Sequence, residues 1–269
     1  MSTIRIGVLQ LCSTGDVDAN LAALQCEVEH CVARGAQFVC TPENTGWLRI
    51  GHADTPRHRI DQCPTVARCS ELAARHGIWL LLGSTLLWDR TSELPTNSSL
   101  LFGPDGGVRA RYDKLHLFRV DLGPDTCFDE ATHVRAGQRP VSAEMAGVRI
   151  GLSICYDLRF PELYRHYAEA GCRILSIPVA FTERTGRDHW EVLLRARAIE
   201  NQAWVVASAQ WGHHGGNRTS FGRAMLVDPW GIVVAQAGDG VGSIVSELDL
   251  GRVDTVRRSL PALEHRRQI

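Results

Sequence analysis

The sequence predicts an α/β protein with helices packed on mixed β-sheets, and three observations support this class. Strand-like and helix-like patterns alternate along the first third of the chain, which is typical of layered α/β folds. In the middle, the turn signal Gly103-Pro-Asp-Gly-Gly107 separates two strand-like runs, which predicts an antiparallel pair. No linker, repeat or low-complexity tract interrupts the 269 residues, so we expect one domain over residues 1–269.

The first half of the chain begins with an apolar strand at 4–11. Residues 18–33 place Leu21, Leu24 and Val28 on one helical face, and Gly35 ends that helix. A short strand at 38–41 ends at a Pro-Glu-Asn sequence. The remaining elements expected here are a helix at 64–76, a strand at 78–83, and the antiparallel strands 98–102 and 108–112.

The second half of the chain opens with residues 119–138, which carry Gly, Pro, Asp and Thr without a clear period. They predict a long loop, and such loops inside domains are usually functional. The turn Asp228-Pro-Trp-Gly231 predicts a hairpin of strands 223–227 and 232–235. The other expected strands are 149–154, 174–178, 204–209 and 242–247, and the other expected helices are 161–170, 188–201 and 250–258.

Bulk composition excludes several classes of protein. A net charge of −1 and a pI near 6.8 argue against binding to nucleic acid or to an acidic membrane surface. The nine cysteines are scattered singly, which argues against a zinc ribbon or a disulfide framework and favours a reducing compartment. No signal peptide is visible, and the most apolar run, 78–88, is too short to span a bilayer. We therefore expect a soluble, cytoplasmic protein.

The motif that organises the chain is Arg149-Ile-Gly-Leu-Ser-Ile-Cys155-Tyr-Asp-Leu-Arg-Phe-Pro-Glu162. Its first half reads as a buried strand, and Pro161 suits the first turn of a helix. Cys155 therefore falls at a sharp strand-to-helix turn. Such a thiol is either a structural buried cysteine or a nucleophile that needs a base to deprotonate it.

Two further charged residues follow predicted strands. Glu43 could act as a general base if it is partly buried, and Lys114, among apolar neighbours, could stabilise charge on a carbonyl oxygen. Taken singly, each also fits a surface carboxylate or a surface lysine. Together with Cys155 they would supply the base, the oxyanion stabiliser and the nucleophile that acyl transfer through a thioester requires. The rival bases for a Cys–His pair are His116, His189 and His213.

Three stretches in order resemble the nitrilase superfamily of carbon–nitrogen hydrolases, with its Glu–Lys–Cys triad. They are Pro42-Glu43-Asn44, Tyr112-Asp-Lys114-Leu-His-Leu, and Ser153-Ile-Cys155-Tyr-Asp-Leu-Arg-Phe-Pro-Glu162, and the matching runs from Ile4 to about Arg267. The resemblance implies a four-layer α-β-β-α sandwich with mixed sheets, no metal or organic cofactor, and homodimers packed sandwich to sandwich.

The resemblance also implies roles for individual residues. Glu43 takes the thiol proton and later activates water, while Cys155 attacks an amide carbonyl. Lys114 and the backbone N–H of Tyr156 hold the oxyanion, ammonia leaves, and water releases the acid. A second family glutamate corresponds to Glu130 in Phe128-Asp-Glu130, although Ala131 replaces the small hydroxyl residue that usually follows it.

Within the superfamily the chain resembles the Nit branch. The segments 189–200, 225–231 and 259–267 look like the Nit1 group, the deaminated glutathione amidases. The Nit2 group, ω-amidases acting on 2-oxoglutaramate and 2-oxosuccinamate, shares much of this pattern. Gly186-Arg187-Asp188 stands where the branch usually has Gly-Pro-Ala, so these charges would affect substrate choice if the segment lines the pocket mouth.

The substrates of both groups carry carboxylates, so we expect Arg or Lys in the pocket. The candidates for substrate binding are Arg159, Arg187, Arg195, Tyr156 and Phe118. Two other hypotheses are a nitrilase proper, which would release ammonia from a nitrile, and a catalytically silent binding or scaffold member of the fold. The intact triad argues against the silent member. The leading hypothesis is an amidase that hydrolyses a small carboxylate-bearing amide to acid and ammonia, with the 2-oxoglutaramyl group of deaminated glutathione as the expected substrate and an ω-amidase as the alternative. Apart from a second copy of the chain, we expect only the amide and water as partners.

Overall fold

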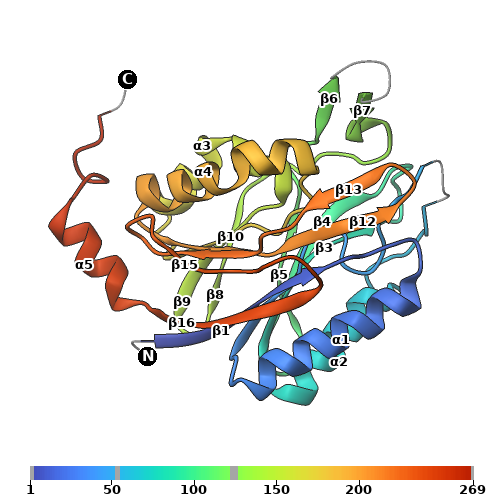
Figure 1. The fold of residues 1–269 in the computed structure, drawn as a ribbon, viewed down its shortest axis with the longest axis horizontal. Helices are drawn as coiled ribbons and strands as arrows, with labels where there is room; N and C mark the ends of the chain where they lie inside the picture. The colour runs from blue at the N-terminus through green and yellow to red at the C-terminus, as the bar shows by residue number, and fades with distance from the viewer. Residues whose placement is uncertain (1–2, 52–54, 122–126, 268–269) are drawn as a thin grey trace.

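Two mixed β-sheets lie face to face, and a pair of helices covers the outer face of each (Figure 1). The computed structural model describes residues 3–51, 55–121 and 127–267. α1 (Val17–Ala33) and α2 (Pro64–His76) cover one sheet, and α3 (Pro161–Glu169) and α4 (Glu183–Asn201) cover the other. The four-layer α-β-β-α sandwich predicted from the sequence is confirmed.

The first sheet has eight strands, with β1 (Thr3–Leu11) near its middle. On one side, β1 pairs in parallel with β2. On the other side, it pairs in parallel with β12 and antiparallel with β16. The path along the sheet is β13 (Arg218–Phe221), β12 (Ala209–Gly215), β1, β2 (Phe38–Cys40), β3 (Trp79–Leu87), β4 (Thr96–Phe102) and β5 (Val108–Asp113), and β16 (Gly242–Asp249) joins at β1.

The second sheet has six strands, and its central strands β9, β10 and β11 are parallel. The order is β15 (Val233–Gln236), β14 (Met225–Val227), β11 (Trp204–Ala207), β10 (Ile174–Ser176), β9 (Val148–Leu152) and β8 (Val141–Met145). The predicted hairpin around residues 228–231 is the antiparallel pair β14–β15. Two short strands, β6 (Arg119–Asp121) and β7 (Cys127–Asp129), form a separate hairpin.

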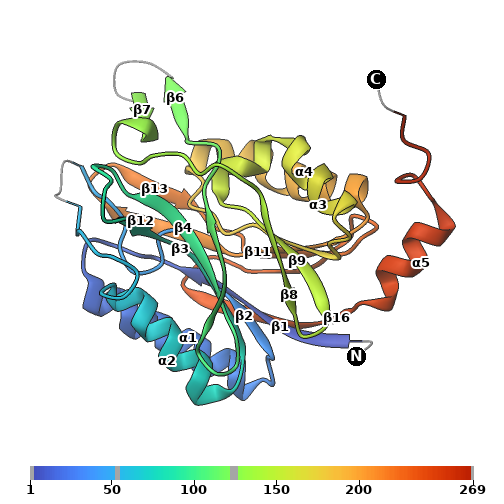
Figure 2. The same cartoon turned by 180° about the vertical axis from the view of Figure 1, so that it is seen from behind.

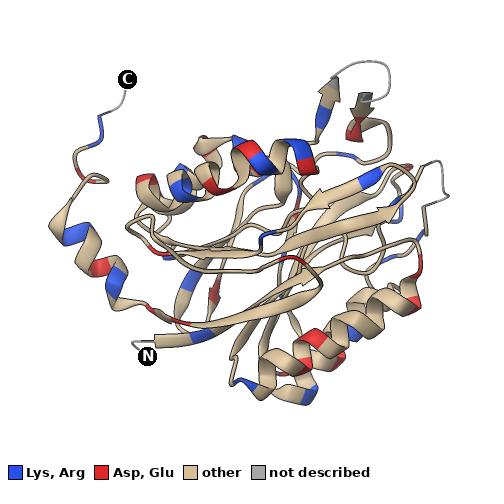
Figure 3. Cartoon of the chain, viewed as in Figure 1, with Lys and Arg blue, Asp and Glu red and all other residues tan. Residues whose placement is uncertain are grey.

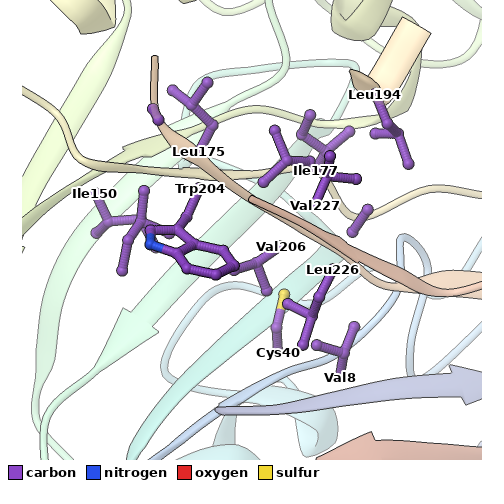
Figure 4. Packing of buried hydrophobic residues seen from close by; sticks show 14 of the residues in the cluster. Val8, Cys40, Ile150, Leu175, Ile177, Leu194, Trp204, Val206, Leu226 and Val227 are labelled. Atoms are coloured by element: carbon purple, nitrogen blue, oxygen red, sulfur yellow. The ribbon is translucent and has the colours of Figure 1, made fainter. Parts of the chain in front are cut away.

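Successive side chains of a strand point to opposite faces of the sheet, so the buried residues form two separate hydrophobic clusters. Ile6 and Val8 of β1 face the second sheet, whereas Leu9 and Leu11 pack under α1 and α2. In the layer between the sheets, Val8 and Cys40 of the first sheet lie close to Val206 and Leu226 of the second (Figure 4). Both faces of the first sheet are therefore buried, which explains why its strands read as continuous apolar runs.

The C-terminal helix α5 (Gly251–Ser259) projects from the sandwich at the end opposite the β6–β7 hairpin (Figure 2). Charges of both signs are interspersed along the outer helices and along α5 (Figure 3). No helix in the described part of the chain is long and apolar enough to cross a membrane.

Three predictions of local structure were wrong. Residues 119–138 are not a single loop, because they contain β6, β7 and the short helix η1 (Glu130–Thr132). The strands β8, β12 and β13 were missed; β12 carries Gly212 and Gly215 at positive φ and a bulge, which break the alternation that marks a strand. Finally, α4 begins at Glu183 instead of 188, because the Thr182 side chain caps a first turn that has no apolar period.

Candidate active site

Cys155 lies at the turn between β9 and the short helix η2 (Cys155–Arg159), as the sequence predicted. Its φ of 51° is a left-handed conformation that a residue with a Cβ adopts only under constraint. Asp157 supplies part of that constraint: its Oδ2 accepts from the backbone N–H of Ile154 at 2.8 Å and from the Tyr112 hydroxyl at 2.7 Å. The backbone N–H of Cys155 donates to Pro178 O at 2.9 Å, which ties the turn to the next strand.

Glu43 follows β2 in a second strained turn, in which Asn44 has a φ of 57°. The Glu43 side chain is buried, and its Oε1 accepts from Lys114 Nζ at 2.9 Å and from Asn97 Nδ2 at 3.0 Å. Its Oε2 accepts from the backbone N–H of Ala180 at 2.9 Å. Burial alone would raise the pKa of Glu43, but the charge and hydrogen bond of Lys114 outweigh it and lower the pKa. The carboxylate is therefore ionised at neutral pH.

Lys114 comes directly after β5 and is only 1% exposed. Its Nζ lies 2.9 Å from Glu43 Oε1 and 2.9 Å from Glu130 Oε2, so one ammonium joins two carboxylates. Burial would lower the pKa of Lys114, but the charges of Glu130 and Glu43 raise it well above its usual value. The ammonium is thus a permanent charge in the site.

The Cys155 thiol is hydrogen-bonded to the Glu43 carboxylate. Burial and the negative charge of Glu43 raise the pKa of Cys155 well above that of a free thiol. At rest the site therefore pairs a neutral thiol with an ionised carboxylate. A thiol in this state becomes a nucleophile only if its proton moves to the carboxylate as it attacks.

These groups open onto a pocket of about 440 Å³, a size typical of sites for small molecules. The sequence candidates Tyr156, Phe118 and Arg159 line it with Glu43, Lys114, Glu130 and Cys155. The Phe118 ring lies 5.2 Å from that of Tyr156, and the backbone N–H of Phe118 donates to Glu130 Oε2 at 2.7 Å. Glu130 thereby joins the β6–β7 hairpin to the triad.

The structure does not bring Arg187 or Arg195 to this pocket. The Arg187 guanidinium is exposed on α4 and pairs with Glu183 at 2.9 Å, and Arg195 Nε donates to Gly231 O. In the segment before His189 it is Glu183 and Thr185 that line the pocket.

The rival histidines are engaged elsewhere. His116 Nδ1 lies 2.7 Å from Asp157 Oδ1, and the ring stacks on Phe160 with centroids 3.7 Å apart. His189 Nδ1 lies 3.3 Å from both terminal nitrogens of Arg159. His213 is exposed on β12. None of these three histidines lines the pocket; among the described lining residues, His133 is the one histidine.

Sequence reasoning missed several residues of the site. Asn97, the second residue of β4, donates to Glu43 Oε1, and its Nδ2 also lies 3.4 Å from Glu130 Oε1. Arg49 and Arg218 line the pocket, and Arg218 Nη1 donates to Arg49 O at 2.9 Å. The polar residues at the start of β4, which ends in apolar residues, were a local sequence signal for Asn97. No feature of the neighbouring sequence marked Arg49 or Arg218.

One group of side chains could share a metal ion, and it lies outside the pocket. Cys26, Glu27 and His30 of α1 place one ligand atom each within 4.8 Å of the others. Cys26 and His30 are exposed on the outer layer of the sandwich.

Comparisons with known proteins agree with this architecture. The carbon–nitrogen hydrolase family model matches residues 5–258. A deaminated glutathione amidase from Yersinia enterocolitica is 39% identical over 272 residues, covering 99% of this chain and 94% of that protein. The crystal structure of the C. elegans NitFhit protein gives a TM-score of 0.92 at 39% identity, covering 99% of this chain and 66% of that one.

A second solved structure, Nit3 of Saccharomyces cerevisiae, is described as a member of branch 10 of the nitrilase superfamily. It gives a TM-score of 0.87 at 27% identity and covers 99% of this chain and 97% of its own. The resemblance to the Nit branch seen in the sequence is confirmed. Since the family model and these relatives extend over almost the whole chain, the protein belongs to the carbon–nitrogen hydrolase family.

Proposed function

We propose that this protein is an amidase that hydrolyses deaminated glutathione through a Cys155 thioester. The observation that carries the proposal is the meeting of the Glu43 carboxylate, the Lys114 ammonium and the Cys155 thiol in one buried pocket. Relatives that align with nearly the whole chain and carry the name deaminated glutathione amidase support the choice of substrate.

In the acylation step, Cys155 Sγ attacks the amide carbonyl carbon while the thiol proton passes to Glu43. The carbonyl oxygen becomes an oxyanion, which Lys114 and the backbone N–H of Tyr156 stabilise. Glu43 then returns its proton to the amide nitrogen, the C–N bond breaks and the amine leaves. Ionised Glu43 beside a neutral thiol is the starting state that this step needs.

In the deacylation step, Glu43 takes a proton from water, and the hydroxyl oxygen attacks the thioester carbonyl. The C–S bond breaks, the acid is released, and the proton returns to Cys155. Glu130 also holds the Lys114 ammonium, so that the oxyanion donor keeps its position through both steps.

The leaving group depends on the substrate. Both amide nitrogens of deaminated glutathione are substituted, so cleavage next to its 2-oxoglutaryl group releases cysteinylglycine and 2-oxoglutarate. Ammonia, the product expected from the sequence, would leave from 2-oxoglutaramate and not from deaminated glutathione. We further propose a single domain that forms a homodimer, and the free thiols support a reducing compartment such as the cytoplasm.

A substrate panel tests the proposal. We expect the purified protein to hydrolyse deaminated glutathione with a higher kcat/KM than 2-oxoglutaramate, simple amides or nitriles. Liquid chromatography of cysteinylglycine and an ammonia assay would separate these activities. The Cys155→Ala variant should lose all turnover while its circular dichroism spectrum stays unchanged, and retained turnover would refute the thioester. A preference for 2-oxoglutaramate would instead identify an ω-amidase.

A further inference from the structure

Three arginines in the pocket wall lack a carboxylate partner, although most arginines in the described part of the chain form an ion pair with Asp or Glu. Arg49, Arg159 and Arg218 all line the pocket, and none forms an ion pair with a carboxylate of the described residues. By contrast, exposed Arg187 and buried Arg197 are both paired with glutamates. A partly buried guanidinium without a counter-ion is costly, so these cations favour an anionic ligand.

Arg218 lines the same pocket as Glu43, Lys114 and Cys155. It stands at the start of β13, is partly buried, and uses Nη1 to hold Arg49 O at 2.9 Å. Burial lowers the pKa of Arg218, while the negative charges of Glu43 and Glu130 oppose that shift, so its guanidinium interacts electrostatically with the triad. Within the described part of the chain its other N–H donors have no hydrogen-bond acceptor, which suits a planar carboxylate.

Arg159 occupies a different part of the wall. It is the last residue of η2, and its guanidinium lies over the rings of Phe181 and Tyr156, at 5.4 Å and 5.8 Å from their centroids. His189 of exposed α4 contacts it at 3.3 Å. These neighbours orient the guanidinium plane without neutralising its charge. Arg159 therefore presents a cation without a carboxylate partner to the pocket, at a wall that it forms with Tyr156 and Phe181.

We propose that the pocket recognises its substrate as a dianion, with Arg218 binding the 2-oxo carboxylate of the acyl part and Arg159 binding the carboxylate of the leaving amine. This inference rests on the proposed function and extends it. 2-Oxoglutaramate has only the first of these carboxylates, because its leaving group is ammonia. The two arginines therefore contribute unequally to the two substrates.

The unequal contribution is testable with four variants. Arg218→Gln should lower kcat/KM about 100-fold on both deaminated glutathione and 2-oxoglutaramate, and Arg218→Lys should recover part of the loss. Arg159→Gln should lower kcat/KM about tenfold on deaminated glutathione and leave 2-oxoglutaramate within about twofold. Arg187→Gln, whose side chain lies outside the pocket, is the matched control and should change neither.

A second measurement separates substrate binding from damage to the triad. Iodoacetamide is a small neutral amide that alkylates Cys155 without needing a carboxylate site. We expect Arg218→Gln to be alkylated at a rate within about threefold of wild type, and 2-oxoglutarate to protect wild type but not this variant. Slower alkylation in Arg218→Gln would assign Arg218 to the electrostatics of the triad and overturn the inference.

The two hypotheses fail in different ways. A wild-type protein that hydrolyses neither substrate refutes the proposed function, whereas protection by 2-oxoglutarate tests the Arg218 site without any turnover. Equal losses on both substrates in Arg159→Gln, or no loss in Arg218→Gln, would overturn the assignment of the two carboxylates even in an active enzyme.

Discussion

Glu43 is the residue at which most of the site's interactions meet. Its two oxygens accept hydrogen bonds from Lys114, Asn97 and the backbone N–H of Ala180. The Cys155 thiol also forms a hydrogen bond with this carboxylate. These donors come from both sheets. The carboxylate therefore holds the site together, and in the proposed mechanism it also accepts the thiol proton, so a substitution there would remove both functions.

We expect Glu43→Gln to lower kcat/KM on deaminated glutathione by about 10³-fold or more, because neither the thiol nor water would have a base. The new amide would also direct its N–H groups at the donor of either Lys114 or Ala180, since only one of the two oxygens remains an acceptor. Steady-state kinetics measure the loss, with exposed Glu191→Gln of α4 as the control. A loss of less than tenfold would contradict the role of Glu43 as base.

At the residue scale the triad could be predicted from the sequence because each member follows a strand. The strain at Cys155 and Asn44 could not, since both have ordinary side chains and their positive φ depends on contacts from distant segments. Arg218 was missed because it begins β13, a four-residue strand too short to show an alternating pattern, 63 residues beyond Cys155.

Among the elements, β3 holds the Glu43 turn in place. The register of β3 against β4 shifts between Leu82 and Thr85, and at this bulge Ser84 Oγ accepts from the backbone N–H of Asn44 at 2.9 Å. Gly83 lies in the same bulge. A Cβ on Gly83 would lie 2.0 Å from Thr41 O and 2.3 Å from Pro42 O, so only glycine allows the two segments to approach this closely.

We expect Gly83→Ala to displace the turn that carries Glu43. The free energy of unfolding should fall by about 1–3 kcal/mol, as in other overpacked sites, and kcat/KM should fall by at least about tenfold. Urea denaturation and kinetics measure the two effects. Gly242→Ala in β16 is the control, because a Cβ there meets nothing within 4 Å. Full activity in Gly83→Ala would show that the turn tolerates displacement.

Helices and strands were predictable where the hydrophobic periodicity and the residues that begin or end an element, such as proline and glycine, indicate the same bounds. α2 matches its predicted bounds at Pro64 and His76, because a proline opens it and Gly77 ends it in the left-handed conformation. β6 and β7 were not predictable, since three-residue strands show no alternation and depend on their mutual pairing.

For the molecule as a whole, buried thiols link stability to pH. Burial raises the pKa of Cys40 to about 12 and that of Cys31 to about 11, whereas a thiol in the unfolded chain ionises near about 8.5. Above that pH the unfolded chain gives up protons that the folded chain retains. The stability contributed by these neutral thiols is therefore complete below about pH 8.5 and declines as the pH rises.

We expect the free energy of unfolding to fall between about pH 8.5 and 10 by up to about 1.4 kcal/mol per pH unit for each such thiol. Urea denaturation at pH 7, 9 and 10 measures the slope. Cys40→Ala should be less stable at pH 7 but should show a shallower decline. Identical slopes in the variant and the wild type would rule out Cys40 as a contributor.

At this scale the layered sandwich followed from the alternation of elements and from the family resemblance. The pairing of β1 with β12 and β16 did not, because it joins the first strand of the chain to strands more than 190 residues away. Contacts of such sequence separation are set by tertiary packing, and local patterns do not encode them.

The division of the site between the two sheets has a consequence for a chain that emerges from the ribosome N-terminus first. The base and the ammonium are synthesised early, the nucleophile later, and the strands that complete the first sheet last of all. A chain that stops before Cys155 would carry the proposed base and ammonium without the proposed nucleophile. A chain that stops before β12, β13 and β16 would contain all three side chains but lack three strands of the first sheet, so we expect activity only from a nearly complete chain.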